Sequence, residues 1–327
     1  MNRRETLLAL LALGATSPAL PVRAQAGRTY RVASAWMTTE ANSRPLEQVF
    51  LDALKGYGYV VGRNLVYESR YAGGEPARLP GLVDELMAGK PDALVGIEQV
   101  AQVMKGKTSS IPIVLFNSSD PVAAGLVQSL ARPGGNVTGA AFLYEQMGPK
   151  HMELMREILP RTKRVAQLHD TNVPGSKAAE ANARQAAEML GLAYLPYHVA
   201  NRADVELAFV AMAKSQPDAL VGGAGSGMLF GLRQLIVENT SRLRIALITT
   251  AASTVDLGGL MSYGSPLEEG FRMAAYYVDR ILKGARPADL PVQQATRFEM
   301  VINLKTAKVL GLTIPKSVLL RADRVIE

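Results

Sequence analysis

Few side chains in this sequence have the type and spacing that catalysis or metal binding requires. There is no cysteine, which excludes disulfides, thiolate metal sites and cysteine nucleophiles. The three histidines, His151, His169 and His198, lack metal-ligand spacing, and neither an H-E-x-x-H nor a G-x-S-x-G motif occurs. His198 alternates along a strand pattern, which favours a structural role, whereas His169 is a candidate polar group of a cleft or a general base. The sequence therefore favours a binding protein without metal or cofactor over an enzyme.

A glycine-rich loop at residues 223–227 follows an apolar run and precedes a helical pattern. A dinucleotide-binding G-x-G-x-x-G fingerprint would need glycine where Met228 stands, and the loop lies late in its half of the chain, not after the first strand. Dinucleotide binding is therefore not expected, although a helix N-terminus of this kind can accept a carboxylate or phosphate.

Short apolar runs alternate with amphipathic stretches through most of the chain, a pattern typical of parallel sheets covered by helices on both faces. Strands are expected at residues 30–35, 65–71, 93–97, 111–116, 164–169, 192–199, 219–223 and 244–249. Helices are expected at residues 44–56, 77–88, 100–105, 176–190, 203–214 and 229–238. The tail adds strands at 259–263 and 297–302 and helices at 267–283 and 304–310.

Three short motifs recur in the same order and at nearly the same spacing in the two halves of the chain, which indicates an internal repeat. They are Arg-Val-Ala at 31–33 and 164–166, Pro-Asp-Ala-Leu-Val-Gly at 91–96 and 217–222, and the apolar runs 111–114 and 245–248. The expected fold is therefore α/β, with two doubly wound parallel-sheet lobes joined by a hinge of several strands. Crossings are expected near 144–149, 263–266 and 288–293, which makes lobe 1 residues 27–144 plus 265–288 and lobe 2 residues 145–264 plus 289–327. Such a hinge suits ligand capture.

Side chains at the carboxyl ends of the expected strands are the candidates for ligand binding, because ligands of open α/β sheets bind beyond those ends. Two crossing residues are further candidates. From the first half come Trp36, Met37, Glu98, Gln99, Asn117 and Ser118, from the second half His169, Asp170, Ser226 and Thr250, and from the crossings Phe142 and Tyr263.

Three of these positions have competing interpretations. Trp36, the single tryptophan, is either a core or rim aromatic or a cleft residue, since polar residues begin where its strand ends. Glu98 is either a solvated carboxylate that the helix dipole favours at a helix start, or a contact to a cationic group of the solute, most simply an amine. Asp120 is expected to cap a following helix, with Pro121 at the first helical position.

The N-terminus has the layout of a secretory signal peptide, with basic Arg3 and Arg4, an uncharged run at 6–15 and small residues before 27. Cleavage is expected after Ala24 or Ala26, and the run is too short to span a membrane. The arginine pair fits either an ordinary basic region or a twin-arginine signal. The full chain carries a net charge of +7, and its basic residues are scattered among acids without interleaved aromatics, so nucleic-acid binding is not expected.

Several longer stretches match a known family pattern. They are DPVAAGLV at 120–127, SLARPGGNVTG at 129–139, GGLMSYG at 258–264, YVDRILKG at 277–284, LPV at 290–292, FEMVINLKTA at 298–307, GLTIP at 311–315 and LRAD at 320–323. Over essentially the whole mature chain the sequence resembles the ABC transporter substrate-binding family that includes the tryptophan- and aromatic-amino-acid-binding proteins.

The resemblance implies a periplasmic-binding-protein-like fold of type I with three crossings. It implies a periplasmic monomer that captures a small polar solute, an amino acid or a related molecule, for a membrane permease and an ATPase. A periplasmic sensor for a chemoreceptor or kinase would share the same site, and an exported enzyme on the same scaffold is a third possibility.

Three departures from the family pattern lie near strand ends that face the expected cleft. Glu98 and Gln99 stand where members usually carry Thr-Pro or Ser-Pro, Ala246 stands where a proline is common, and the glycine loop at 223–227 replaces a polar and aromatic segment. The resemblance therefore leaves the identity of the solute open.

Overall fold

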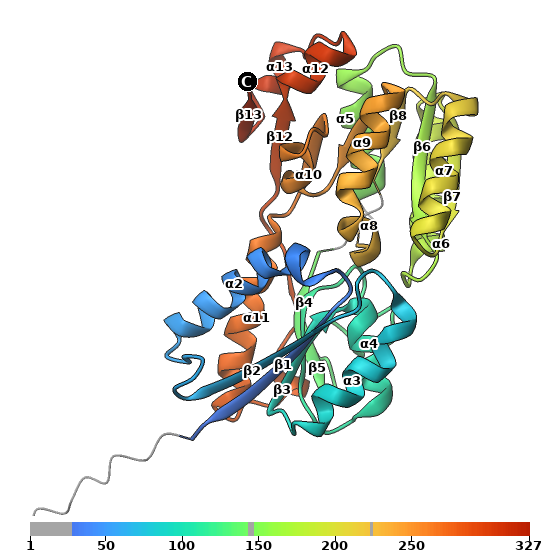
Figure 1. Cartoon of the computed structure of the whole chain (residues 1–327). Coiled ribbons are helices and arrows are strands. Elements are labelled where there is room, and N and C mark those ends of the chain that lie inside the picture. The colour runs from blue at the N-terminus through green and yellow to red at the C-terminus, as the bar shows by residue number, and fades with distance from the viewer. Residues whose placement is uncertain (1–27, 143–146, 223–224) are drawn as a thin grey trace, which may run out of the picture.

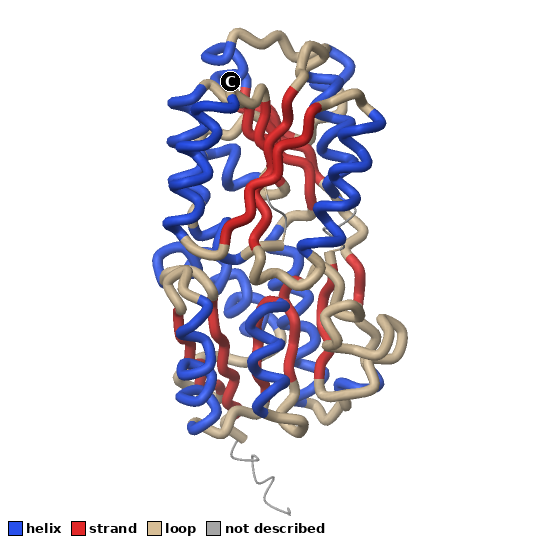
Figure 2. Tube along the Cα trace, turned by 90° about the vertical axis from the view of Figure 1, so that its right-hand side faces the viewer, coloured by secondary structure: helices blue, strands red, loops and turns tan. Residues whose placement is uncertain are grey.

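The protein folds into two α/β lobes stacked end to end (Figure 1). The computed structural model describes residues 28–142, 147–222 and 225–327. Each lobe has a central sheet with helices on both faces, as the cartoon and the tube view show (Figures 1 and 2). Within the described ranges no helix is both long enough and apolar enough to cross a membrane.

The first lobe is built on a six-stranded sheet of order β11-β5-β4-β3-β1-β2, in which all pairings are parallel. Its strands are β1 (Tyr30–Trp36), β2 (Leu65–Tyr71), β3 (Ala93–Ile97), β4 (Ile113–Asn117), β5 (Val137–Ala141) and β11 (Gln293–Gln294). Its helices are α2 (Glu40–Gly56), α3 (Leu79–Ala88), α4 (Glu98–Lys107) and α11 (Leu267–Leu282), with 3-10 turns at Pro76–Arg78 and Pro287–Asp289.

Neighbouring residues of β1 point to opposite faces of this sheet and enter two separate cores. Val32 and Trp36 pack with residues of α2 and α11, whereas Ala33 and Ala35 pack with residues of α3 and α4. Burial on both faces explains why apolar residues occupy neighbouring positions in this strand and do not alternate strictly with polar ones.

The second lobe is built on a seven-stranded sheet of order β13-β12-β10-β9-β8-β6-β7. Its strands are β6 (Arg164–Asp170), β7 (Ala193–Val199), β8 (Ala219–Val221), β9 (Ala246–Thr249), β10 (Met261–Gly264), β12 (Glu299–Asn303) and β13 (Arg324–Ile326). Its helices are α5 (Met147–Ile158), α6 (Ser176–Met189), α7 (Arg202–Ser215), α8 (Gly227–Gly231), α9 (Arg233–Leu243), α10 (Ala252–Asp256), α12 (Leu304–Leu310) and α13 (Lys316–Leu319).

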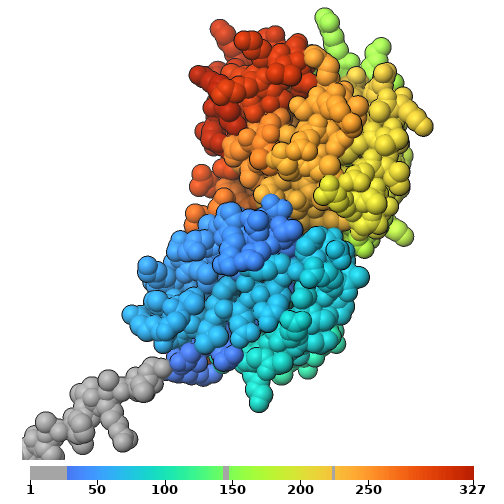
Figure 3. Space-filling view, in the orientation of Figure 1, coloured from blue at the N-terminus to red at the C-terminus, as the bar shows by residue number. Residues whose placement is uncertain are grey.

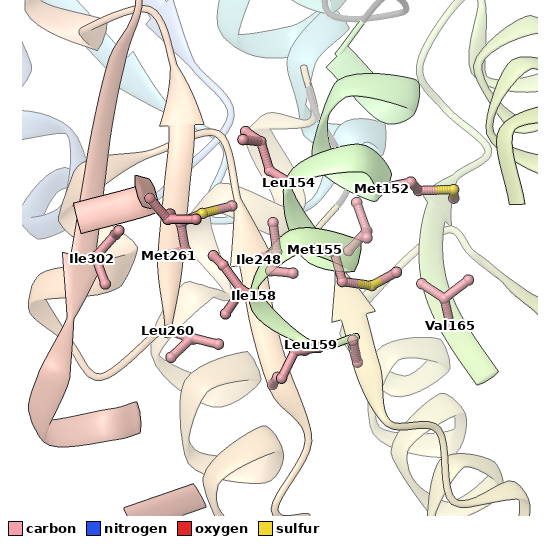
Figure 4. Close-up of a cluster of buried hydrophobic side chains, with 14 of the residues drawn as sticks. Met152, Leu154, Met155, Ile158, Leu159, Val165, Ile248, Leu260, Met261 and Ile302 are labelled. Carbon is pink, nitrogen blue, oxygen red and sulfur yellow. The ribbon is translucent and has the colours of Figure 1, made fainter. Parts of the chain in front are cut away.

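One core of this lobe lies between α5 and the sheet (Figure 4). Met155 and Ile158 of α5 belong to the same buried cluster as Val165 of β6, Ile248 of β9 and Ile302 of β12. Burial of each such side chain stabilises the fold by roughly 1.5–3 kcal/mol relative to its exposed state.

The sheet of the second lobe is mixed, because β12 runs antiparallel to β10 and β13 pairs parallel with β12. The C-terminal part of the chain thus adds two strands, β12 and β13, at one edge of the sheet, and they run antiparallel to the other strands.

The chain passes between the lobes at positions close to two of the three expected crossings. The first crossing was expected near residues 144–149, of which residues 144–146 lie outside the described residues. The second falls between β10 and α11, and Ser265 there donates a hydrogen bond to the carbonyl of Arg297 at 2.6 Å, which ties it to the third crossing.

The third crossing comes later than the expected boundary at residue 288. Strand β11 pairs with β5, Thr138 Oγ1 donates to the carbonyl of Leu290 at 2.7 Å, and Val292 is buried in a core of the first lobe. Residues 289–294 therefore belong with the first sheet.

Two local expectations were also wrong. No helix follows Asp120; its Oδ1 accepts from the amides of Val122 at 3.0 Å and Ala123 at 2.9 Å and caps a turn instead. The single helix expected at 229–238 is two helices, α8 and α9, which meet at Leu232.

Candidate functional site

A cavity lies between the two lobes, where the carboxyl ends of β1, β3 and β4 face those of β8 and β9. Its empty volume is about 1080 Å³ with open solvent at its mouth included. The described residues that line it from the first lobe include Trp36, Met37, Thr38, Asn42, Ile97, Glu98, Asn117, Ser119 and Phe271, and those from the second include Ser226, Gly227, Phe230, Arg233, Thr249, Thr250 and Thr254.

Glu98, the first residue of α4, is a buried carboxylate on the cavity wall, with 4% of its surface exposed. Its Oε2 accepts hydrogen bonds from Ser118 Oγ and from the amide of Asp120 at 3.1 Å. Its Oε1 is buried and has no hydrogen-bond partner among the described residues. Burial raises the pKa of this carboxyl, and the hydrogen bonds from Ser118 and from the backbone of Asp120 and Ser119 lower it in part. Glu98 is therefore not the solvated helix-start carboxylate of the competing interpretation.

Trp36 combines both of its expected roles, because it is a core aromatic whose surface also lines the cavity. Its ring stacks on Phe116 at a centroid distance of 5.0 Å and on Phe271 at 5.5 Å. Its Nε1 donates to Ser34 Oγ at 2.8 Å, so the buried indole N–H is satisfied. The cavity thus has a rigid aromatic wall on the side of the first lobe.

Ser226 and Asp170 form a hydrogen-bonded pair in the second lobe. Ser226 Oγ donates to Asp170 Oδ2 at 2.6 Å and accepts from the amide of Leu229 at 3.0 Å, which caps α8. Asp170 Oδ1 accepts from the amide of Asn172 at 2.9 Å. Ser226 faces the cavity, while Asp170 fixes the position of α8 from behind it.

A smaller cavity adjoins the first and shares Ser119, Gly222, Ser226 and Leu229 with it. His169 and Asp170 line this second space. His169 Nε2 donates to Tyr194 Oη at 2.5 Å, and Tyr194 in turn donates to Gln167 Oε1 at 2.8 Å. Burial lowers the pKa of His169 to about 4. A neutral histidine in a satisfied chain of hydrogen bonds fits a structural role better than that of a general base.

The two lobes are in contact on the face shown in Figure 3. Helix α8, which contributes to the wall of the main cavity, makes one contact with the first lobe. A methyl group added at Gly227 would come within 2.8 Å of Met37 Cβ and Ile97 Cδ1, and one at Gly231 within 3.2 Å of Thr38 Cγ2. Asn42 Nδ2 donates to the carbonyl of Gly231 at 3.2 Å across the same contact. The absence of side chains at these two helix positions allows α8 to approach the first lobe this closely.

The structure brings together about half of the residues singled out from the sequence. Trp36, Met37, Glu98, Asn117, Ser226 and Thr250 line the main cavity. Ser118 lies behind Glu98 as its hydrogen-bond donor, and His169 and Asp170 line the adjoining cavity.

Three other candidates lie elsewhere. Gln99 is buried, with neither amide atom paired among the described residues. Phe142 packs with Ala140 in a small buried cluster. Tyr263 stacks on Phe298 at a centroid distance of 5.8 Å, and its carbonyl accepts from His151 Nε2 at 2.6 Å.

Arg233 is a cavity residue that the sequence did not single out. It opens α9, directly after the break at Leu232, and no sequence pattern marked that break. Its guanidinium carbon lies 4.3 Å from the centre of the Phe230 ring, and its Nη1 donates to the carbonyl of Phe230 at 2.9 Å. Burial lowers the pKa of Arg233. Asn42 of α2, Thr38 after β1 and Phe271 of α11 are further cavity residues that were not singled out from the sequence.

The described residues contain no cluster of three or more His, Cys, Asp or Glu that could hold a metal ion. The main cavity instead combines an aromatic and apolar wall, one acid, one base and several hydroxyl and amide groups. Such a surface binds a small molecule with both polar and apolar parts.

Two doubly wound lobes with a cavity between the carboxyl ends of their strands define a two-lobed solute-binding protein. The chain belongs to the ABC transporter substrate binding protein family, whose model matches residues 42–326. It is accordingly a solute-binding protein with the periplasmic-binding-protein-like fold of type I.

Known proteins similar to this chain agree with that assignment. A conserved domain protein of Vibrio cholerae has a solved structure with a TM-score of 0.84 and 31% identity, covering 91% of this chain and 100% of that one. An ABC domain of Streptococcus pneumoniae in complex with L-Trp has a TM-score of 0.83 and 26% identity, covering 91% and 100%. The tyrosine-binding protein of Clostridioides difficile (strain R20291) is 24% identical over 264 residues, which are 80% of this chain and 75% of that one.

Proposed function

We propose that this chain is the periplasmic receptor of an ABC importer and that it binds a small, amine-bearing polar solute in the cavity between its lobes. It acts by binding and release and not as an enzyme. Its partners are the permease and ATPase subunits of the importer, and it works as a monomer.

Glu98 is the observation that carries this proposal. The Oε1 atom of this buried carboxylate accepts no hydrogen bond from the described residues, so it is available as an acceptor for a bound group. An ammonium group of a bound solute would supply the missing donor in a charge-assisted hydrogen bond.

The relatives support an amino acid as the solute class. One is named as a tyrosine-binding protein, and another is solved in complex with L-Trp. Both ligands carry an ammonium group, a carboxylate and an aromatic ring. The acid, the base and the stacked aromatic wall of Trp36 and Phe271 would complement those three parts.

A sensor and an enzyme, the two alternatives, differ from a receptor in the event that binding triggers. The cavity offers the enzyme little support, because the histidines of the chain do not line it. His169 lies in the hydrogen-bonded chain with Tyr194, His151 donates to a backbone carbonyl, and His198 pairs with Glu180 on the surface.

Mass spectrometry of protein purified without denaturation would identify the co-purified solute, and uptake of that labelled solute would then be measured in cells with and without this gene. Loss of uptake on deletion, restored by the wild-type gene, is expected. Intact uptake with loss of a chemotactic or transcriptional response would favour the sensor, and turnover of the solute by the purified protein would favour the enzyme.

A further inference from the structure

Helix α2 buries polar side chains at the end that borders the main cavity. Its buried residues are Ser43, Glu47, Phe50 and Leu54, so the buried face is polar near the cavity and apolar further along. Ser43 lines the cavity, whereas Glu47, one turn later, does not. Glu47 is 1% exposed, and a carboxylate is costly to bury where an apolar side chain would pack. The stability of the core therefore does not explain an acid at this position.

Tyr71 links Glu47 to the strand that carries Trp36. Tyr71 Oη donates to Glu47 Oε2 at 2.8 Å, and Tyr71 lies beside Trp36 in the parallel register of β2 and β1. A phenol has one proton, which Tyr71 gives to the carboxylate, so Ser69 Oγ is the donor in its 2.9 Å hydrogen bond with Tyr71 Oη. The carboxylate thus sets the direction of the hydrogen bonds at this end of β2.

A second set of hydrogen bonds on the same face of the sheet ends at the indole of Trp36. Trp36 Nε1 donates to Ser34 Oγ at 2.8 Å, and Ser34 Oγ shares a hydrogen bond of 2.7 Å with Tyr67 Oη. Burial, followed by the charge of Glu47, raises the pKa of Tyr67, so the carboxylate acts on this hydroxyl as well. The negative charge attracts the phenolic proton, which leaves Tyr67 Oη to accept from Ser34. The hydrogen bonds then run in one direction from the indole and polarise one another.

We infer that Glu47 is a positioning residue of the binding site, which holds the indole of Trp36 in its orientation on the cavity wall without touching the solute. This inference rests on the proposed function, because it concerns the wall that the solute contacts. Without the charge, either Ser34 or Tyr67 can be the donor in the bond between them, and the indole N–H loses its polarised acceptor. The ring of Trp36 then samples more orientations, and the cavity binds its solute more weakly.

The indole N–H of Trp36 provides a direct test in the solute-free protein. Trp36 is the single tryptophan, so isotope-labelled tryptophan gives one indole N–H signal in the NMR spectrum. Glu47→Gln keeps an acceptor for Tyr71 but removes the charge, and Glu47→Met removes both. Tyr67→Phe keeps the ring but removes the hydroxyl beside Ser34, so it tests the same hydrogen bonds even if Glu47→Met fails to fold.

The affinity of each variant is measured by calorimetric titration of L-tryptophan and L-tyrosine. The matched control is Asp52→Asn, an exposed acid on the same helix. A double variant, Glu47→Met with Tyr67→Phe, shows whether the two residues act through the same hydrogen bonds, because changes that remove one shared interaction do not add.

In Glu47→Met and in Tyr67→Phe the indole signal should shift, and its hydrogen exchange should become roughly tenfold faster, as the weakening of one hydrogen bond predicts. The affinity of the tighter-binding amino acid should fall roughly tenfold in each variant and little further in the double variant. Glu47→Gln should lie between wild type and Glu47→Met in both measurements. Asp52→Asn should match wild type.

Several results would overturn the inference. One is an unchanged indole signal in folded Glu47→Met or Tyr67→Phe. Another is a shifted signal with unchanged affinity, which would make the hydrogen bonds structural only, and a third is additive losses in the double variant. Failure of both amino acids to bind wild type would overturn the assignment of Glu47 to solute affinity, whereas the receptor function is decided separately by the co-purified solute and the uptake measurement.

Discussion

Asn42 of the first lobe donates a hydrogen bond from Nδ2 to the carbonyl of Gly231 in the second, at 3.2 Å. Next to this bond, Gly227 and Gly231 bring α8 against Met37, Ile97 and Thr38. Because the contact joins the two lobes beside the cavity, we expect it to form when the lobes close on a solute and to be lost when they part.

Gly227→Ala is expected to weaken solute binding roughly tenfold while leaving the unliganded protein folded. The added methyl group would meet two side chains of the other lobe at 2.8 Å, and overpacking of this kind costs about 1–3 kcal/mol. In the open form the same substitution improves helix propensity. Titration of the co-purified solute measures the affinity, and small-angle scattering measures the compaction that accompanies binding.

The matched control is Gly81→Ala in α3, where an added methyl group meets nothing within 4 Å. It should bind solute as wild type. Unchanged affinity and compaction in Gly227→Ala would show that the lobes do not close along this contact.

Trp36 is expected to report binding by fluorescence. It is the single tryptophan of the chain, it is 6% exposed, and it forms part of the cavity wall. A non-fluorescent solute should change its emission in a saturable manner and reduce its quenching by acrylamide. The dissociation constant should match that from calorimetry. A calorimetric binding curve without any change in Trp36 emission would place the solute elsewhere.

Two buried histidines are expected to make the protein sensitive to mild acid. Burial lowers the pKa of His151 and of His169 from 6.5 to about 4. Because the folded pKa lies below the unfolded one, the unfolded chain binds more protons between pH 6.5 and 4, and stability is lost as the pH falls through that window. The loss is on the order of 3 kcal/mol per histidine at pH 4.

Urea unfolding at pH 7 and pH 5 measures this effect. His151→Gln keeps a donor for the carbonyl of Tyr263 and should reduce the slope of stability against pH by about one proton. An unchanged slope in both His151→Gln and His169→Gln would refute the prediction.

The leader is expected to be removed during export. N-terminal sequencing of protein from the cell envelope should begin at Gln25 or Gly27. Recovery of the uncleaved chain from the cytoplasm would contradict the periplasmic location.

Much of the fold could be predicted from the sequence, because strands buried on both faces leave continuous apolar runs such as residues 93–97. Strand β5 was missed because it contains Gly139, and glycine is unfavourable in strands. Gly139 has a positive φ of 134°, and a methyl group added at its Cα would lie 2.4 Å from the carbonyl oxygen of Leu115. No other residue therefore fits at this position. Strand β11 has only two residues, too short for any periodicity.

The site was predictable only in part, for a different reason. The rule that ligands bind at the carboxyl ends of strands placed Trp36, Glu98 and Thr250 at the cavity. It could not place Arg233, because that residue reaches the cavity from a helix start created by the break at Leu232. Nor could the rule show that Glu98 lines the cavity whereas Ser118 lies behind it. The direction of a side chain depends on packing that one sequence does not reveal.

The sharpest test of solute capture at Glu98 is calorimetric titration of the co-purified solute into wild type and Glu98→Gln at neutral pH. Glutamine keeps an oxygen for Ser118 and Asp120 but removes the charge. The control is Glu40→Gln, an exposed acid in the first turn of α2. Because burial raises the pKa of Glu98 above 4.5, wild-type affinity should also fall as the pH is lowered toward that raised pKa, and the affinity of Glu98→Gln should not.

Loss of one partner of a buried charge pair typically costs about 2–5 kcal/mol, so Glu98→Gln should bind roughly 30-fold more weakly or worse. Glu40→Gln should bind as wild type. Equal affinities of wild type and Glu98→Gln would mean that Glu98 only fixes the loop at Ser118 and Asp120 and that the solute is held by other groups.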